Sequence, residues 1–303
     1  PRALSLAIAG LDLPPGSRIA IGALSARLWE EAIRANGHLP VVVDCDEANP
    51  ALSAASLAAI HAAEPVAAVV LGNELGLSSD MAAIRETGVP VVADVSAVLG
   101  WACGETTGEG SELPVRDFGD CLVVGLEAAS PVTAGGGVAI LTGSAGAKAR
   151  AIQSCLKELA EALPPEVFLS DMNAALARTQ NRELSGFMER RVNIQEIFRR
   201  AALRGRHKLL HPGSGPAAVA FSFPLVIQSS TSEVQTYARK KNVETAHAFA
   251  RSILAGLDQA DEFDPRTFPH ALSLSLRCLL FPLYPGLSQK EIETIEKVIA
   301  TLP

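Results

Sequence analysis

Residues 119–137 read GDCLVVGLEAASPVTAGGG, and this stretch carries most of the information about the fold. The apolar, β-branched run at 121–125 predicts a strand, a bend follows, and the three glycines at 135–137 predict a tight turn before another strand. No lysine occurs in the chain before Lys148. The stretch therefore predicts two strands that meet at a glycine turn, with no basic amine between them.

The first half of the chain alternates short apolar runs with alanine-rich amphipathic stretches. This alternation predicts right-handed crossovers and an α/β fold, with a mainly parallel sheet sandwiched by helices. The expected strands are 18–21, 40–44, 67–71, 90–93, 121–125 and 137–141, and the helices expected between the first four are 25–36, 52–62 and 80–87.

The second half is richer in helical patterns, beginning with 145–162 and a long pattern over 171–203. The loop 205–216 carries three glycines and two prolines, which predicts a hinge between two domains. We therefore expect a large domain at 1–203 that ends in a long connecting helix, and a smaller C-terminal α+β domain at 204–303. Within the smaller domain we expect a strand at 217–227 and helices at 232–241, 245–257 and 288–301, the last with a capping box formed by Ser288 and Glu291.

Composition narrows the classes of protein to consider. The chain of 303 residues is 48% hydrophobic and 19% charged, with a net charge of −7 and a pI near 5.5. An acidic chain lacks the basic face that a nucleic-acid-binding protein needs, and no apolar run reaches the roughly 20 residues that span a bilayer. The five cysteines are dispersed, which is typical of reduced thiols in a cytoplasmic protein: Cys45, Cys103, Cys121, Cys155 and Cys278.

Five blocks, in order along the chain, resemble the DegT/DnrJ/StrS sugar aminotransferases, which are pyridoxal-phosphate-dependent enzymes of fold type I. They are LPPGS at 13–17, GHLPVVVDCD at 37–46, DMAAIRETGVPVVAD at 80–94, DFGD at 117–120 and FPLYPGLS at 281–288. The resemblance covers most of the chain. It implies an aminotransferase-like large domain in which the family's N-terminal phosphate-binding turn is missing, followed by the small α+β domain.

The resemblance also implies the positions of the site residues, and most of them have changed. The Schiff-base lysine falls on Ser130, whose hydroxyl cannot form an imine. Asp94 keeps the position of the aspartate that pairs with the pyridine nitrogen, and we interpret it as vestigial. The positions of the ring-stacking aromatic, the glutamine at the ring hydroxyl and the phosphate-binding serine fall on Ala26, Ala97 and Gly125. We therefore expect no catalytic residue and no bound cofactor.

Some members of this family carry a histidine in place of the lysine and act as dehydratases. This chain has no histidine between His61 and His207, so we expect no group with a pKa near 7 at the Ser130 position. His207 and His211 are four residues apart, but no third ligand lies near them in the sequence, and we expect no metal site.

These observations favour a catalytically impaired family member, a pseudoenzyme that serves as a binding, scaffold or partner subunit in nucleotide-sugar or polysaccharide biosynthesis. A nucleotide-sugar is the candidate ligand. Active relatives share sites across a dimer, so the resemblance implies a homodimer or a heterodimer with an active paralogue. The alternative is an active sugar-nucleotide aminotransferase, or a lysine-independent enzyme that uses pyridoxal or pyridoxamine phosphate. A third hypothesis is a protein that binds no ligand and keeps the family's fold only as an interaction module.

Overall fold

A six-stranded sheet organises the first half of the protein. The computed structural model describes residues 1–99, 118–128, 130–142, 146–211, 222–256 and 264–303. The strand order is β2-β1-β3-β4-β5-β6; the first five strands are parallel and β6 is antiparallel to β5. The strands are β1 (Arg18–Gly22), β2 (Leu39–Val43), β3 (Ala68–Leu71), β4 (Val91–Asp94), β5 (Cys121–Gly125) and β6 (Val138–Thr142). All six lie where the sequence predicts them, and the mainly parallel α/β sheet is confirmed.

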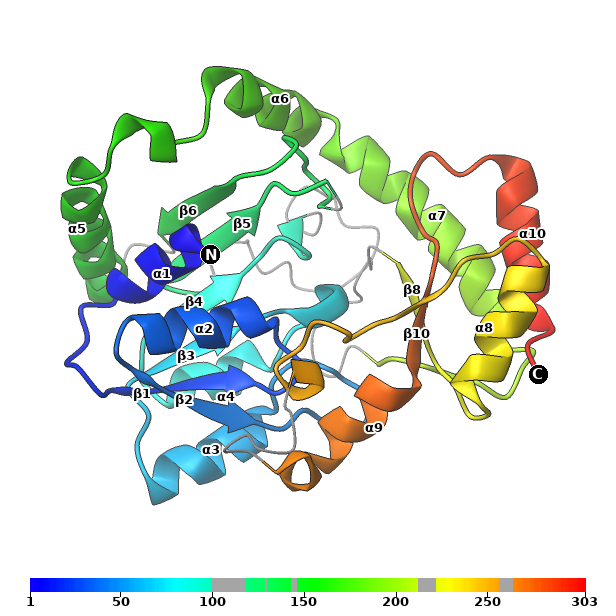
Figure 1. Cartoon of the computed structure of the whole chain (residues 1–303), viewed down its shortest axis with the longest axis horizontal. Coiled ribbons are helices and arrows are strands. Elements are labelled where there is room, and N and C mark those ends of the chain that lie inside the picture. The colour runs from blue at the N-terminus through cyan, green and yellow to red at the C-terminus, as the bar shows by residue number, and fades with distance from the viewer. Residues whose placement is uncertain (100–117, 129, 143–145, 212–221, 257–263) are drawn as a thin grey trace.

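Helices cover both faces of this sheet, because successive strand residues point to opposite sides. Ile19 and Ile21 pack in one core with helices α1, α2 and α5, whereas Ala20 packs in a second core with α3 and α4. In Figure 1, α1 and α2 lie in front of the sheet. These helices are α1 (Arg2–Ala9), α2 (Arg27–Ala35), α3 (Ala54–Ala63), α4 (Met81–Glu86) and α5 (Ala147–Glu161), and a short 3₁₀ turn η1 (Glu74–Gly76) follows β3.

The second half forms a smaller antiparallel sheet with helices packed against it. Its strand order is β7-β8-β10-β9, from β7 (Lys208–Leu209), β8 (Phe223–Val226), β9 (Ala246–His247) and β10 (Cys278–Phe281). Helices α8 (Thr231–Lys240), α9 (Pro269–Arg277) and α10 (Gln289–Ala300) complete this half. The expected helix at 288–301 and its capping box are confirmed. Residues 217–221 of the strand expected at 217–227 lie outside the described residues.

The helical pattern at 171–203 forms two helices rather than one. They are α6 (Asp171–Arg182) and α7 (Leu184–Ala202). The break is at Glu183, whose amide makes a long 3.4 Å hydrogen bond to the Thr179 carbonyl. Leu184 and Met188 of α7 pack in the core behind the large sheet, and Phe198 packs in the core of the second half. This helix therefore joins the two halves, as Figure 1 shows. The division of the chain at 203/204 stays a prediction.

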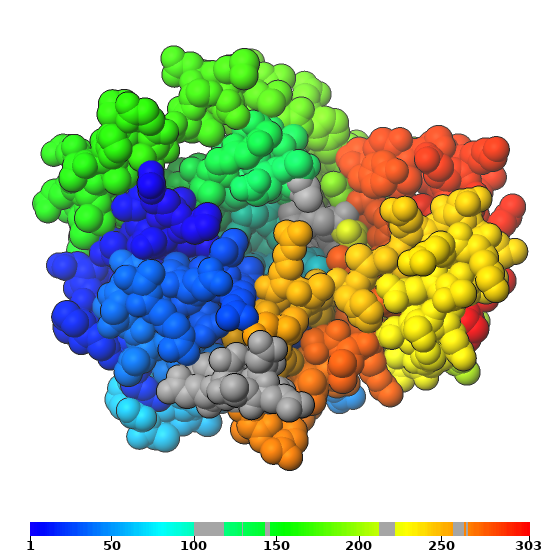
Figure 2. Space-filling view, in the orientation of Figure 1, coloured from blue at the N-terminus to red at the C-terminus, as the bar shows by residue number. Residues whose placement is uncertain are grey.

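The prediction of a helix at 245–257 is wrong. That segment contains β9, an irregular stretch and a 3₁₀ turn, η5 (Leu254–Gly256). Its backbone is bonded to the turn between β1 and α2: the amide of Ile253 donates to the Ser25 carbonyl at 2.9 Å, and the amide of Arg27 donates to the Arg251 carbonyl at 3.1 Å. These tertiary hydrogen bonds override the local helical pattern. Figure 2 shows the gold-orange residues near 250 lying against the blue surface of the first half.

The turn expected at 135–137 is confirmed. The three glycines adopt φ values of +75°, +137° and +107°, a region that residues with a β-carbon rarely enter. A β-carbon on Gly137 would also lie 2.5 Å from Leu169. Among the described residues, no helix is long and apolar enough to span a bilayer.

Candidate functional site

A cavity of ≈ 280 Å³ lies at the carboxyl ends of β1, β3 and β4. We call it the strand-end cavity. Parallel sheets place ligand groups at this edge, because the loops that follow neighbouring strands converge there. Four segments line it, contributing Leu24, Ala26 and Trp29; Gly72, Asn73, Glu74 and Leu75; Asp94, Ser96 and Ala97; and Ala248, Phe249, Arg251 and Ser252.

Asp94 ends β4 and has several hydrogen-bond partners in the protein. Its Oδ1 accepts hydrogen bonds from the Ser96 amide at 3.0 Å and from the Ser96 hydroxyl at 2.5 Å. The side chain of Trp29, which is 1% exposed, also bonds to this carboxylate. Burial raises the pKa of Asp94, and the bonds from Ser96 and Trp29 oppose that rise because they stabilise the ionised form. The protein therefore already uses the group that the sequence predicts as a vestigial ring partner.

Glu74 is a second carboxylate in the same cavity, and sequence reasoning missed it. The Ser25 hydroxyl donates a hydrogen bond to its Oε1. Burial raises the pKa of Glu74 to about 7, the Ser25 bond opposes this, and the nearby charge of Asp94 raises the pKa further. Glu74 is not at the Ser130 position, so the expectation that no group with a pKa near 7 lies at that position stays a prediction. The sequence feature that could have identified Glu74 is its position, three residues after the end of a buried strand.

The loop that carries Glu74 has an unusual backbone. Asn73 and Leu75 have φ values of +48° and +57°, which cost free energy for residues with a β-carbon. A β-carbon on Gly72 would lie 2.0 Å from Oε1 of Glu74, so glycine is required for the carboxylate to fold back over the loop. Asn73 is 1% exposed; its Nδ2 donates to the Asp94 carbonyl at 2.8 Å, and its Oδ1 has no partner among the described residues.

The structure brings the predicted site positions together. Ala26, Asp94 and Ala97 line the strand-end cavity. The amide of Gly125 donates to the Ser96 hydroxyl at 2.7 Å, and a β-carbon built on Gly125 would lie 3.8 Å from the Ser130 hydroxyl oxygen. Ser130 therefore lies near Gly125, which is linked to Asp94 through the Ser96 hydroxyl.

All lysines of the chain lie within the described residues, and none of them lines the strand-end cavity. They are Lys148, Lys157, Lys208, Lys240, Lys241, Lys290 and Lys297. The first of these, Lys148, donates to the carbonyl of Gly88, which precedes β4 and so lies at the opposite edge of the sheet.

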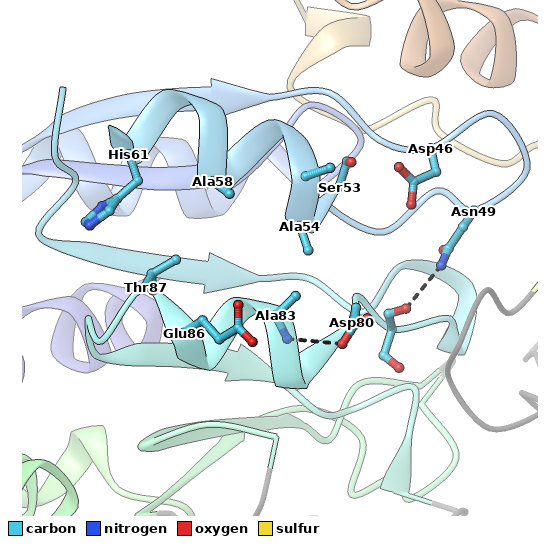
Figure 3. Close-up of a pocket in the computed structure, with 12 residues that line it drawn as sticks. Asp46, Asn49, Ser53, Ala54, Ala58, His61, Asp80, Ala83, Glu86 and Thr87 are labelled. Carbon is cyan, nitrogen blue, oxygen red and sulfur yellow. Dashed lines mark hydrogen bonds between the residues drawn. The ribbon is translucent and has the colours of Figure 1, made fainter. Parts of the chain in front are cut away.

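A larger cavity of ≈ 500 Å³ lies between α3 and α4 (Figure 3). We call it the α3–α4 groove. Its polar groups serve the local structure: Oδ1 of Asp80 accepts hydrogen bonds from the first amides of α4 at 3.1 Å, Asn49 donates to the Ser78 carbonyl at 3.1 Å, and Nδ1 of His61 accepts the Val66 amide at 3.2 Å. No group of three potential metal ligands occurs in the described parts of the chain. In the second half, Nδ1 of His207 accepts a hydrogen bond from the Gln228 amide.

The chain belongs to the DegT/DnrJ/EryC1/StrS aminotransferase family, whose sequence model matches residues 2–302. A relative from Saccharopolyspora spinosa, described as dTDP-4-dehydro-2,3,6-trideoxy-D-glucose 4-aminotransferase, is 24% identical, over 97% of this chain and 80% of the relative.

Solved structures confirm the aminotransferase fold. The S. venezuelae DesV structure, in complex with a ketimine intermediate, has a TM-score of 0.81 at 20% identity and covers 99% of this chain and 81% of its own. A sugar aminotransferase from Streptococcus pneumoniae in its PMP form has a TM-score of 0.80 at 15% identity and covers 98% and 83%.

Several residues at the positions that the resemblance assigns to the coenzyme lack the groups that would hold it. Ser130, near Gly125, carries a hydroxyl, which cannot form an imine. Ala26, in the cavity wall, offers no aromatic face for a ring, and Gly125 has no hydroxyl. Glu74 lies in the same cavity wall as Asp94.

Proposed function

We propose that this family member does not transaminate and that it serves as a binding or partner subunit in nucleotide-sugar or polysaccharide biosynthesis. The observation that supports this most is the serine hydroxyl of Ser130 beside Gly125, with every lysine of the chain outside the cavity. Transamination needs an amine that forms the imine and then moves protons on the bound substrate. A hydroxyl supplies neither step.

Loss of the tether alone would leave the coenzyme bound by its ring and phosphate, so the other changes matter. Ala26 removes the stacking surface and Gly125 removes a phosphate donor. Asp94 is already hydrogen-bonded by Ser96 and Trp29. Together these changes remove the non-covalent contacts as well, and we expect no bound cofactor.

A second candidate function is a lysine-independent enzyme, and Glu74 is the observation that favours it. A carboxyl group with a pKa of about 7 is suited to general acid–base catalysis at neutral pH. Glu74 is held by Ser25 and is part of the cavity wall, so it meets the requirement for position as well as for pKa. The acceptor substrate of such an enzyme would be a sugar nucleotide.

The test is to incubate the purified chain with pyridoxal phosphate and to record the visible imine band before and after borohydride reduction. Peptide mapping then locates any reduced adduct. We expect only scattered surface labelling, equal to that given by pyridoxal, which lacks the phosphate. The Ser130→Lys variant should gain little, because the stacking and phosphate contacts are still missing.

A stoichiometric, reducible adduct on one lysine of the natural chain would overturn the proposal. Nucleotide-sugars are then tested by thermal shift, because a ligand that prefers the folded state raises the melting temperature. Turnover of a sugar nucleotide that is lost in Glu74→Gln would favour the second candidate. Co-purification with a lysine-bearing paralogue tests the heterodimer, and the mass of the purified protein in solution tests the homodimer.

A further inference from the structure

One residue that lines the strand-end cavity carries a buried acceptor with no donor in the described part of the chain. Asn73 is 1% exposed and lines the cavity, and its Oδ1 has no hydrogen-bond partner in the described residues. Its Nδ2 is fixed on the Asp94 carbonyl, which holds the side chain in place. A buried acceptor without a donor costs free energy, and a bound group that donates a hydrogen bond would remove this cost.

Two carboxylates lie beside this acceptor. Glu74 and Asp94 both line the cavity and keep intermediate exposure, so they are reached from it. Among the described residues, the ionisable groups near Glu74 include the Cys45 thiol, which burial and the neighbouring carboxylates keep neutral by raising its pKa, and Arg251, an exposed residue that also lines the cavity. The described part of the cavity is therefore rich in hydrogen-bond acceptors.

The remaining walls are apolar and limit the size of a ligand. Trp29 and Phe249 are buried aromatic residues, and Leu24 and Leu75 complete the walls. The ≈ 280 Å³ volume far exceeds one water molecule and is at the lower end of small-ligand pockets. A hard metal ion would need six or more oxygen ligands, which these walls do not supply.

We propose that the strand-end cavity binds a small organic ammonium ion, whose N–H groups donate to the Glu74 and Asp94 carboxylates and to Oδ1 of Asn73. A primary ammonium carries three donors and no acceptor, which matches three acceptors. Its apolar body packs between Trp29 and Phe249. This inference rests on the proposed function, because a tethered coenzyme would fill the same space.

Binding is coupled to a proton. Glu74, with a pKa of about 7, is partly protonated in the empty cavity at neutral pH, and an ammonium ion prefers the ionised carboxylate. Binding therefore releases a proton near pH 7, and affinity rises as the pH increases from 6 to 8. An amine that stays protonated over this range is required to see the effect.

The test uses the whole chain with benzylamine as the probe and benzyl alcohol as its neutral counterpart. Calorimetry at pH 6, 7 and 8, in buffers of different ionisation enthalpy, gives the affinity and the protons released. We expect benzylamine to bind and to raise the melting temperature, and benzyl alcohol to do neither. Glu74→Gln should weaken benzylamine binding by about tenfold or more and remove its pH dependence, because a charge-assisted hydrogen bond is lost.

Two further variants guard against an indirect effect. Gly72→Ala keeps both carboxylates but displaces Glu74, since the new β-carbon would occupy the place of Oε1, and it should weaken binding similarly. Glu86→Gln changes the same charge at an exposed site in the α3–α4 groove and should have no effect.

Equal stabilisation by benzyl alcohol, or unchanged benzylamine affinity in Glu74→Gln, would overturn the inference. If a variant fails to fold, the comparison of benzylamine with benzyl alcohol on the natural chain still tests the inference. If benzylamine does not bind and pyridoxal phosphate forms no site-specific imine, this inference is wrong and the proposed function is not affected. A site-specific imine would instead contradict the proposed function.

Discussion

The strand-end cavity and the α3–α4 groove differ in how their polar groups are satisfied. In the groove, Asp80, Asn49 and His61 each bond to backbone atoms of neighbouring turns and helices, although the groove is the larger of the two. In the strand-end cavity, Glu74 has a strongly raised pKa, and Oδ1 of Asn73 has no donor among the residues that the structure describes. Volume alone therefore does not identify a binding site; unsatisfied buried polar groups do, because the fold gains nothing from them.

Replacing Trp29 by alanine is expected to have the largest effect. This side chain is 1% exposed and also bonds to Asp94. Trp29→Ala should lower the free energy of unfolding by about 3–5 kcal/mol, because it leaves a large void. Denaturant unfolding measures this. The neighbouring Leu28→Ala, at a residue 44% exposed, should change it by less than about 1 kcal/mol. Equal losses in both variants would mean that the wall of the cavity is not rigid.

The second-largest effect is expected in the pH dependence of stability, which should distinguish the strand-end cavity from the α3–α4 groove. Glu74 holds its proton in the folded state up to a pKa of about 7, whereas in the unfolded chain it ionises near 4.5. Between these values the folded state binds more protons, so stability falls as pH rises. Relative to Glu74→Gln, the natural chain should lose about 2–3 kcal/mol between pH 4.5 and 7. Chemical denaturation across this range is the measurement, and parallel curves for the two proteins would contradict it.

In the groove, Asp80→Ala is expected to have a smaller and purely structural effect. The Asp80 carboxylate caps the first turn of α4 by accepting the amides of Ala82 and Ala83. Its loss should lower the free energy of unfolding by about 1 kcal/mol. Benzylamine affinity should stay unchanged, which calorimetry on the folded variant checks. A large change in affinity would show that the groove and the cavity are coupled.

The smallest effect is expected for Glu86→Gln. Glu86 is exposed and lines the groove without a cap to maintain. The free energy of unfolding should change by less than about 0.5 kcal/mol. The same denaturant series measures it, and a drop comparable to that of Asp80→Ala would contradict the distinction drawn between the capping and the exposed carboxylates.

Local patterns predicted much of the fold because the six strands of the large sheet are short apolar runs bounded by glycine, proline or polar residues. The strands at 18–22 and 121–125, and the capping box at Ser288, follow directly from neighbouring residues. The segment 246–256 did not follow this rule. Its backbone hydrogen bonds go to the turn after β1, more than two hundred residues earlier, and no local pattern reports such a partner.

The site was predictable where it depends on strand ends and not where it depends on a loop. Asp94 was identified because a sequence block that resembles the family ends on it, and it also ends an apolar strand. Glu74 was missed because its role depends on Gly72, on left-handed backbone at Asn73 and on the Ser25 hydroxyl, three features brought together only by folding. The raised pKa of Glu74 likewise arises from burial and from Asp94, which are properties of the folded chain.

The fourth side of the strand-end cavity comes from residues 248–252, far downstream of the other three. During synthesis on the ribosome, the loops that carry Glu74 and Asp94 emerge long before this segment does. Until it arrives, this side of the cavity has no wall. The nascent chain can therefore assemble its large sheet early, but it completes the cavity only when most of the polypeptide has been translated.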